Sequence, residues 1–202
     1  MFDSTRYRID PEVADRFVAG QRHGTLVATE PGGHPQVTLL PFVKTGDEIE
    51  LHAVQADPTF AAVQHNPSVT FLVADYLAWT PHDAVDARDG GRATLHYLAV
   101  AFECEATWST DPGDVAGALA RLLAHYEPDG AYEPVGDGPF YGGRLRQLAT
   151  IRLHVVRSQA KFKAGPPRPD EKCRVVDALR RRDLPGDARA ADVIAGFLPS
   201  DL

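Results

Sequence analysis

The stretch that decides the fold is His52-Ala-Val-Gln-Ala-Asp-Pro-Thr-Phe60, which leads into Gln64-His65-Asn66-Pro67. Its first residues continue an alternation of apolar and polar side chains, the pattern of a half-buried strand. Asp57-Pro58 then has the form of a helix N-cap followed by proline, which predicts a short helix over Thr59–Gln64. One histidine thus lies on a strand and another at a helix end, where a flat cofactor can meet an imidazole. We infer a cofactor-binding protein.

Strands flank this segment on both sides. They show period-two alternation or a high content of β-branched residues, and Pro31-Gly-Gly33 and Thr45-Gly-Asp47 have the composition of hairpin turns. The six predicted strands are His23–Thr29, Gln36–Val43, Glu48–Ala53, Val69–Ala74, Leu95–Trp108 and Thr150–Phe162. Their spacing is not that of βαβ units, so the sequence predicts an α+β protein with an antiparallel barrel or strongly curved sheet.

Helices are predicted late in the chain. Each has an apolar face at helical spacing, and the first begins with a second Asp-Pro pair. They are Asp111–Tyr126, with Val115, Leu119, Leu122 and Leu123 on one face; Pro169–Arg182; and Asp187–Phe197, whose stripe is Val193, Ile194, Phe197 and Leu198. We predict one domain over residues 1–202, with a helical C-terminal extension at 169–202.

Composition narrows the function classes. The 202 residues are 44% hydrophobic, enough for a full core, and the formal net charge of −7 argues against nucleic acid as a partner. We read Arg180-Arg181-Arg182 as cations that compensate a helix dipole. There is no run of about 18 uncharged apolar residues and no signal-peptide pattern, so we expect a cytoplasmic protein with no membrane partner. Cys104 and Cys173 are expected to be free thiols.

Several short motifs resemble those of the PaiB-like branch of the FMN-binding split-barrel superfamily. They are Leu40-Pro41-Phe42, Leu51-His52-Ala53, Asp57-Pro58, Thr80-Pro81, His96-Tyr97, and Lys163–Arg168 followed by Asp170-Glu171. The resemblance implies an antiparallel split β-barrel with peripheral helices. It also implies a homodimer that holds its cofactor at the subunit interface.

The departures from the family pattern are informative. Asp57 and His96 replace asparagines, Ala101 and Cys104 replace a His and a Gly, and Gly165-Pro166-Pro167 replaces Ser-Gln-Asn. With these polar groups changed, the chain is most similar to the haem-dependent piperazate synthases of the family. Those enzymes make piperazic acid by closing the N–N bond of N5-hydroxyornithine for peptide natural products. The resemblance therefore implies haem b, with FMN as the alternative cofactor, and a small amino-acid substrate.

A haem iron needs an axial ligand, and imidazole is a common one. His65 is the first choice as metal ligand, and His52 is the second. The alternative for His65 is a structural role, as an exposed histidine at a helix end that interacts with the helix dipole. The alternative for His52 is a hydrogen-bonded residue in the wall of a pocket. His96 can face the same pocket. We read the other histidines as structural, without an identified partner: His23, His34, His82, His125 and His154.

Haem propionates and a substrate carboxylate call for cations. Lys161, Lys163 and Arg168 are the candidates, with Arg144 and Arg146 as further ones; the bland alternative is a solvated basic loop. Trp79 either packs on the haem face or belongs to the core. A base must take a proton from the substrate ammonium, and the candidates are Tyr97, Tyr76 and His96, with no spacing argument to choose between them.

Two alternatives from other classes stay open. One is an FMN-binding oxidoreductase, which predicts a flavin spectrum. The other is a PaiB-type transcriptional regulator, which predicts salt-dependent DNA binding. The chain shows no helix-turn-helix pattern and no basic recognition helix. It also lacks GxSxG, HExxH, GxGxxG and P-loop motifs, which leaves other catalytic classes without support.

Overall fold

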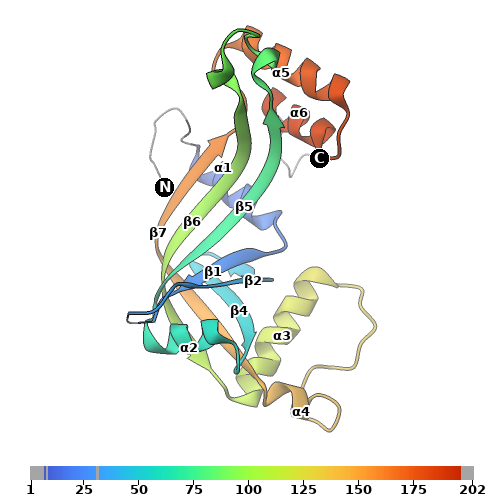
Figure 1. Cartoon of the computed structure of the whole chain (residues 1–202). Coiled ribbons are helices and arrows are strands. Elements are labelled where there is room, and N and C mark those ends of the chain that lie inside the picture. Colours follow the sequence, from blue (N-terminus) through green and yellow to red (C-terminus); the bar gives the residue numbers. More distant parts are fainter. Residues whose placement is uncertain (1–6, 8, 31, 197–202) are drawn as a thin grey trace. The chain divides into compact units, whose positions relative to one another are not determined.

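The computed structural model describes residues 7, 9–30 and 32–196 (Figure 1). Pro31 of the predicted turn and Phe197 and Leu198 of the predicted last helix lie outside the described residues. The strands are β1 (Gly24–Ala28), β2 (Gln36–Leu40), β3 (Val43–Thr45), β4 (Glu48–Val54), β5 (Ser68–Thr80), β6 (Thr94–Ser109) and β7 (Leu148–Lys163).

The helices follow the chain order that the sequence predicts, with additions. The α-helices are α1 (Pro11–Ala19), α2 (Pro58–His65), α3 (Pro112–Tyr126), α4 (Gly142–Leu145), α5 (Pro169–Arg182) and α6 (Asp187–Ala195). Two short 3₁₀ segments follow β5, namely η2 (His82–Ala84) and η3 (Gly90–Arg92).

The strands form one sheet in the order β2-β1-β5-β6-β7-β4-β3. β1 pairs antiparallel with β2 and β5, and β4 pairs antiparallel with β3 and β7. The register of β4 on β7 places His52 opposite Thr150. An antiparallel sheet with peripheral helices confirms the predicted α+β split barrel.

The prediction was wrong in four places. The predicted strand Gln36–Val43 is two strands, because Pro41 has no N–H to continue a ladder. The strand that begins near Val69 runs on to Thr80 as β5, and it buries Leu77 and Ala78 on the way. Helix α1 was not predicted, although Asp10 caps it with the Asp-Pro signal used for α2. Helix α4 lies in a segment that was predicted to be loop.

The chain divides into two compact units. Unit 1 comprises 1–20, 74–100 and 159–202, and unit 2 comprises 21–73 and 101–158. Strands β5, β6 and β7 contribute residues to both units. The single domain with a helical extension stays a prediction.

Unit 2 has a core of apolar side chains, several of them from residues 24–71. Phe42 and Phe71 meet edge to face, with ring centroids 5.3 Å apart. Gly24 lies under the Phe71 ring, where a Cβ atom would come within 2.2 Å of it. On β4, Ile49 and Leu51 point into the core. The other face of that strand carries the polar side chains.

Unit 1 is built around α5 and α6, which pack side by side (Figure 1). Val175, Leu179 and Ile194 fill the space between these helices and their neighbours. At the other end of this unit's sequence, Phe17 of α1 meets Phe162 of β7 edge to face at 5.2 Å. This packing holds the last residues of β7 in place.

Candidate functional site

A cavity of about 200 Å³ lies in unit 1 where three neighbouring strands begin or end. Thr80 is the last residue of β5, Thr94 and His96 begin β6, and Lys163 ends β7. Because β5, β6 and β7 are adjacent in the sheet, these side chains meet at the same end of the three strands. The other lining residues are Tyr7, Val85, Gly91, Arg92, Gly165, Pro166 and Val175.

His96 is a buried polar side chain of this cavity, at 2% exposure. Its Nδ1 accepts a hydrogen bond from the backbone N–H of Gly165 at 3.1 Å. Burial, together with the nearby Lys163 charge, lowers the pKa of His96 to about 4, so the ring is neutral at pH 7. A neutral imidazole whose Nδ1 accepts must carry its proton on Nε2. That buried Nε2–H has no hydrogen-bond partner among the described residues.

Two more donors line the same space. Thr80 is 1% exposed, and its Oγ1 has no partner in the described part of the chain. The Lys163 ammonium donates a short hydrogen bond to Thr94 Oγ1, and no carboxylate of the described residues pairs with it. Lys163 is half-buried, ends strand β7 and lines the cavity, so it does not belong to a solvated basic loop.

Two arginines near the cavity share one buried carboxylate, that of Glu171. Arg92 of η3 donates to Glu171 at 2.6 Å, and Arg168 donates to the same carboxylate at 3.4 Å. Glu171 is only 6% exposed, so both contacts serve to satisfy a buried charge. Arg168, a predicted cofactor cation, is thus exposed at the N-cap position of α5 and paired with Glu171, and it does not line the cavity.

The remaining predicted residues of unit 1 lie outside the cavity lining. Tyr76 and Trp79 on β5 are 63% and 50% exposed, so neither belongs to the core. Tyr97 is half-buried on β6, and the Lys161 ammonium lies 5.9 Å from its ring centroid. The same ammonium lies 5.5 Å from the ring of Tyr7.

His65 and His52 belong to unit 2. His65 is the exposed last residue of α2, a helix that Asp57 caps by accepting from the Thr59 N–H at 2.7 Å. The following residue is tied down as well, because Asn66 donates to Thr29 at 3.2 Å and accepts from the Ser68 N–H.

His52 stands on the polar face of β4, half-buried, and burial lowers its pKa. Of the histidines read as structural, His154 does have a partner, Glu48, at 2.9 Å. Groups of three or more His, Cys, Asp or Glu side chains that could hold a metal ion are absent from the described residues. A bare metal centre built from side chains is therefore not supported there.

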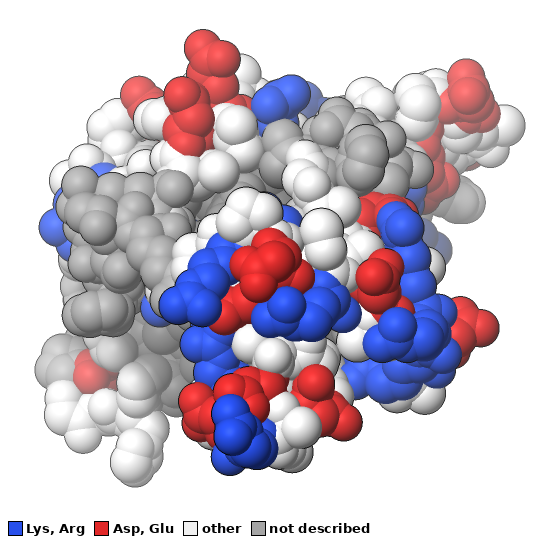
Figure 2. Space-filling view, turned by 90° about the horizontal axis from the view of Figure 1, so that it is seen from above, with Lys and Arg blue, Asp and Glu red and all other residues white. Residues whose placement is uncertain are grey.

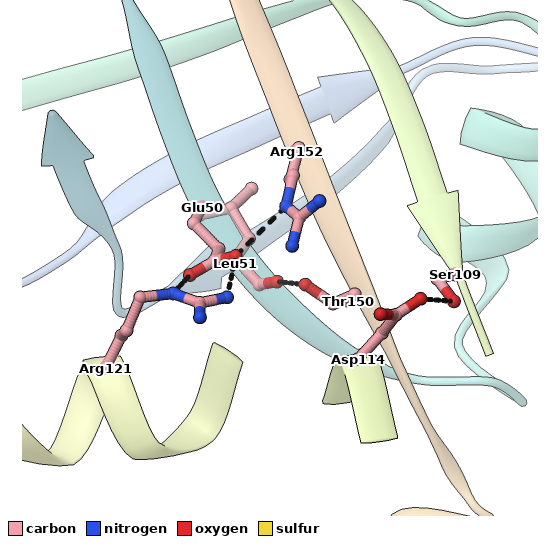
Figure 3. Close-up of polar contacts among 7 residues, drawn as sticks. All are labelled: Glu50, Leu51, Ser109, Asp114, Arg121, Thr150 and Arg152. Atoms are coloured by element: carbon pink, nitrogen blue, oxygen red, sulfur yellow. Dashed lines mark hydrogen bonds and ion pairs between the residues drawn. The ribbon is translucent and has the colours of Figure 1, made fainter. Parts of the chain in front are cut away.

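Glu50 forms a second polar cluster in unit 2, also on β4 (Figure 3). It accepts two hydrogen bonds of 2.7 Å from Arg121 and one of 3.2 Å from Arg152. The Arg121 hydrogen bond is the main cause of the lowered pKa of Glu50. Nearby, Thr150 donates to the Leu51 carbonyl and Ser109 to Asp114. These groups satisfy one another, so we read the cluster as structural.

Charges of both signs share the surface shown in Figure 2, where Lys and Arg side chains are interspersed with Asp and Glu. In the basic run at the end of α5, Arg180 pairs with Asp192 at 3.0 Å and Arg182 with Asp187 at 2.5 Å. Two of the three arginines of this run are thus paired with carboxylates of the same protein. None of the helices in the described residues is long and apolar enough to cross a membrane.

Solved structures with similar folds share little sequence with this chain. The flavocytochrome Anf3 from Azotobacter vinelandii is 19% identical, with a TM-score of 0.64 over 82% of this chain and 74% of that one. The FAD and haem binding protein from Mycobacterium smegmatis is 18% identical, with a TM-score of 0.62 over 82% and 78%. HutZ, described as a haem storage protein from Vibrio cholerae, is 15% identical, with a TM-score of 0.50 over 78% and 96%.

These likenesses support the split-barrel fold. No match was found among curated proteins. A family model covers most of the sequence: residues 1–158 match the one described as "Putative FMN-binding domain". The chain therefore belongs to this FMN-binding domain family.

Proposed function

We propose that the protein is a haem-dependent piperazate synthase, which binds haem b through His65 and cyclises N5-hydroxyornithine to piperazic acid for natural-product biosynthesis. The observation that carries the proposal is the placement of His65. Its ring is exposed at the end of a capped helix, and no hydrogen bond from the described residues occupies it. Haem or a cytochrome is named for solved proteins of similar fold. We further propose a cytoplasmic homodimer that holds its cofactor at the interface.

The histidines differ in their fitness as an axial ligand. An imidazole must present an unprotonated ring nitrogen to iron, and haem needs only one or two such ligands. His96 does not fit, because Gly165 occupies Nδ1 and the other nitrogen carries the proton. His52 fits as the second choice, since burial favours its neutral form. His65 fits best because its ring is open to a ligand of any size.

The proposed reaction is redox-neutral. The α-amine nitrogen forms a bond to N5, the N5–O bond breaks, and the hydroxyl leaves as water after gaining a proton. Bound haem supplies a Lewis acid that weakens the N–O bond. The substrate α-ammonium must first lose a proton. We assign that role to Tyr97, since His96 presents an N–H and Tyr76 is largely exposed.

Absorption spectra of the protein expressed with a haem precursor test this proposal. We expect a Soret band that is lost or shifted in His65→Gly and restored by added imidazole. His125→Gly is the matched control, because His125 is also exposed in the last turn of a helix. An unchanged Soret band in His65→Gly would remove that residue as ligand and move the assignment to His52. Formation of piperazic acid from N5-hydroxyornithine tests the activity itself.

The family match favours a second candidate, an FMN-binding oxidoreductase. It predicts a yellow protein with a flavin spectrum and no Soret band in the same preparation. Trp79 and Lys161 would then be proposed contacts of the flavin in place of haem. A chromophore of neither kind would leave the PaiB-type regulator, which the net charge of −7 and the paired arginines of α5 disfavour.

A further inference from the structure

The cavity of unit 1 is lined by neither His65 nor His52, the histidines proposed as haem ligands. Its volume of about 200 Å³ is below the roughly 300–1,000 Å³ that drug-sized ligands occupy. A flat macrocycle or a flavin does not fit in such a space. Whatever binds here is a small molecule or one end of a larger one.

The polar residues of the lining indicate the charge of the ligand. His96 Nε2–H and the Thr80 hydroxyl are buried and have no hydrogen-bond partner within the described residues. The Lys163 ammonium donates one hydrogen bond to Thr94. Buried polar groups nearly always have a partner, so a set of orphaned donors needs an acceptor. Arg92 adds a further cation to the lining. The nearby carboxylate, Glu171, is already engaged by Arg92 and Arg168.

The apolar lining defines the rest of the ligand. Val85, Pro166 and Val175 face the same cavity as the donors. Inorganic phosphate would gain nothing from such walls, whereas a short hydrocarbon chain would be desolvated against them. A carboxylate accepts through two oxygens, which matches donors on more than one side. The Gly165 N–H holds the His96 ring in the tautomer that donates.

We propose that this cavity binds the carboxylate of a small aliphatic acid, with Lys163, His96 Nε2–H and Thr80 as its donors. The acid's chain lies against Val85, Pro166 and Val175. This class of ligand includes aliphatic amino acids. The proposed site is independent of which cofactor the protein binds. Lys163 and Gly165 lie beyond residues 1–158, which the family model matches, whereas Thr80 and His96 lie within them.

Titration of the ¹⁵N-labelled protein with pentanoate tests the proposal, with the Gly165 amide as the local reporter. We expect a saturable shift of that amide with pentanoate, and none with pentanamide, which has the same shape but no charge. Lys163→Met is expected to weaken pentanoate about tenfold or more, as befits loss of a charge-assisted hydrogen bond, and Lys163→Arg much less. Lys44→Met is the control, since Lys44 belongs to unit 2.

Three results would overturn the proposal. They are no saturable shift with pentanoate in the tens of millimolar, equal shifts with pentanamide, and binding of inorganic phosphate in place of pentanoate. The wild-type comparison of acid and amide decides the matter even if Lys163→Met fails to fold. Because pentanoate has no hydroxylamine, this test stands or falls separately from the haem spectrum.

Discussion

The backbone N–H of Gly165 donates a hydrogen bond of 3.1 Å to Nδ1 of His96 across 69 positions of sequence. This bond ties the loop after β7 to the start of β6. It fixes the tautomer of a fully buried imidazole and turns its other nitrogen into a donor. One main-chain group thereby decides what His96 can do chemically.

The low pKa of His96 predicts an acid-sensitive fold. The unfolded chain takes up a proton near the ordinary value of 6.5, whereas the folded protein resists it until about pH 4. Stability is therefore complete above pH 6.5 and falls between that pH and about 4, by up to roughly 3 kcal/mol from this residue. Urea unfolding of His96→Asn across this range should show a flatter profile, because the amide oxygen can still accept from Gly165. If exposed His125→Asn flattened it equally, burial would not be the cause.

Gly165 itself is predicted to resist substitution. Its φ of +79° is in the left-handed region, and a Cβ atom would come within 2.7 Å of the Ile194 side chain. Gly165→Ala should lower the free energy of unfolding by about 1–3 kcal/mol, from backbone strain and the close contact. Gly138→Ala is the matched control, since no atom lies within 4 Å of its Cβ position. Equal urea midpoints for the two variants would refute this role of Gly165.

Asp57 is predicted to stabilise the helix that ends at His65. Its carboxylate accepts from the Thr59 N–H, so Asp57→Ala should cost about 1 kcal/mol of unfolding free energy. Asp57→Asn should lose only a few tenths, because an amide oxygen caps nearly as well. Chemical denaturation of both variants measures the difference. A loss as large for Asn as for Ala would show that charge, rather than capping, is what matters.

Glu50 is predicted to stabilise unit 2 through its arginines. Glu50→Gln should lower the free energy of unfolding by about 1 kcal/mol at pH 7, discounted because the arginine partners are half exposed. Since the pKa of Glu50 is lowered in the folded state, its contribution is present above the unfolded-state pKa. It is lost as pH falls through the folded-state value. Thermal melts at pH 7 and pH 3 check this.

The control for Glu50 is Glu103→Gln, because Glu103 pairs with Arg157 and both side chains are more than half exposed. This variant should change little at either pH. A difference between wild type and Glu50→Gln that persisted unchanged at pH 3 would contradict the ion-pair explanation.

Local patterns accounted for much of the architecture. Proline after aspartate marked the starts of α2 and α3 within one residue, because capping is decided by side chains adjacent in sequence. The same signal at Asp10-Pro11 would have revealed α1. The end of β5 could not be predicted in this way. Whether Leu77 and Ala78 are buried depends on what packs over them.

In the candidate site, too, some features follow from local sequence and others from tertiary packing. The residue types around His96 and Lys163 singled these segments out, but the sequence did not predict the roles of two arginines of unit 1, Arg92 and Arg168. Arg92 was missed, and the only hint was its place among glycines and aspartates before β6. Arg168 was expected at the cofactor and instead supports Glu171. Thr80 carried no sequence signal beyond its proline neighbour.

By itself the sequence determined the antiparallel strands, the capped helices and the chemical types available to the site, since these follow from neighbours along the chain. Only the tertiary structure decided which donors are buried and unpaired. Thr80, Thr94 and Lys163 meet because β5, β6 and β7 are adjacent in the sheet, and this adjacency brings Lys163 to Thr94 across 69 positions of sequence. Burial then set the charge state of His96, and one backbone N–H set its tautomer. Both effects arise from packing, which local sequence does not encode.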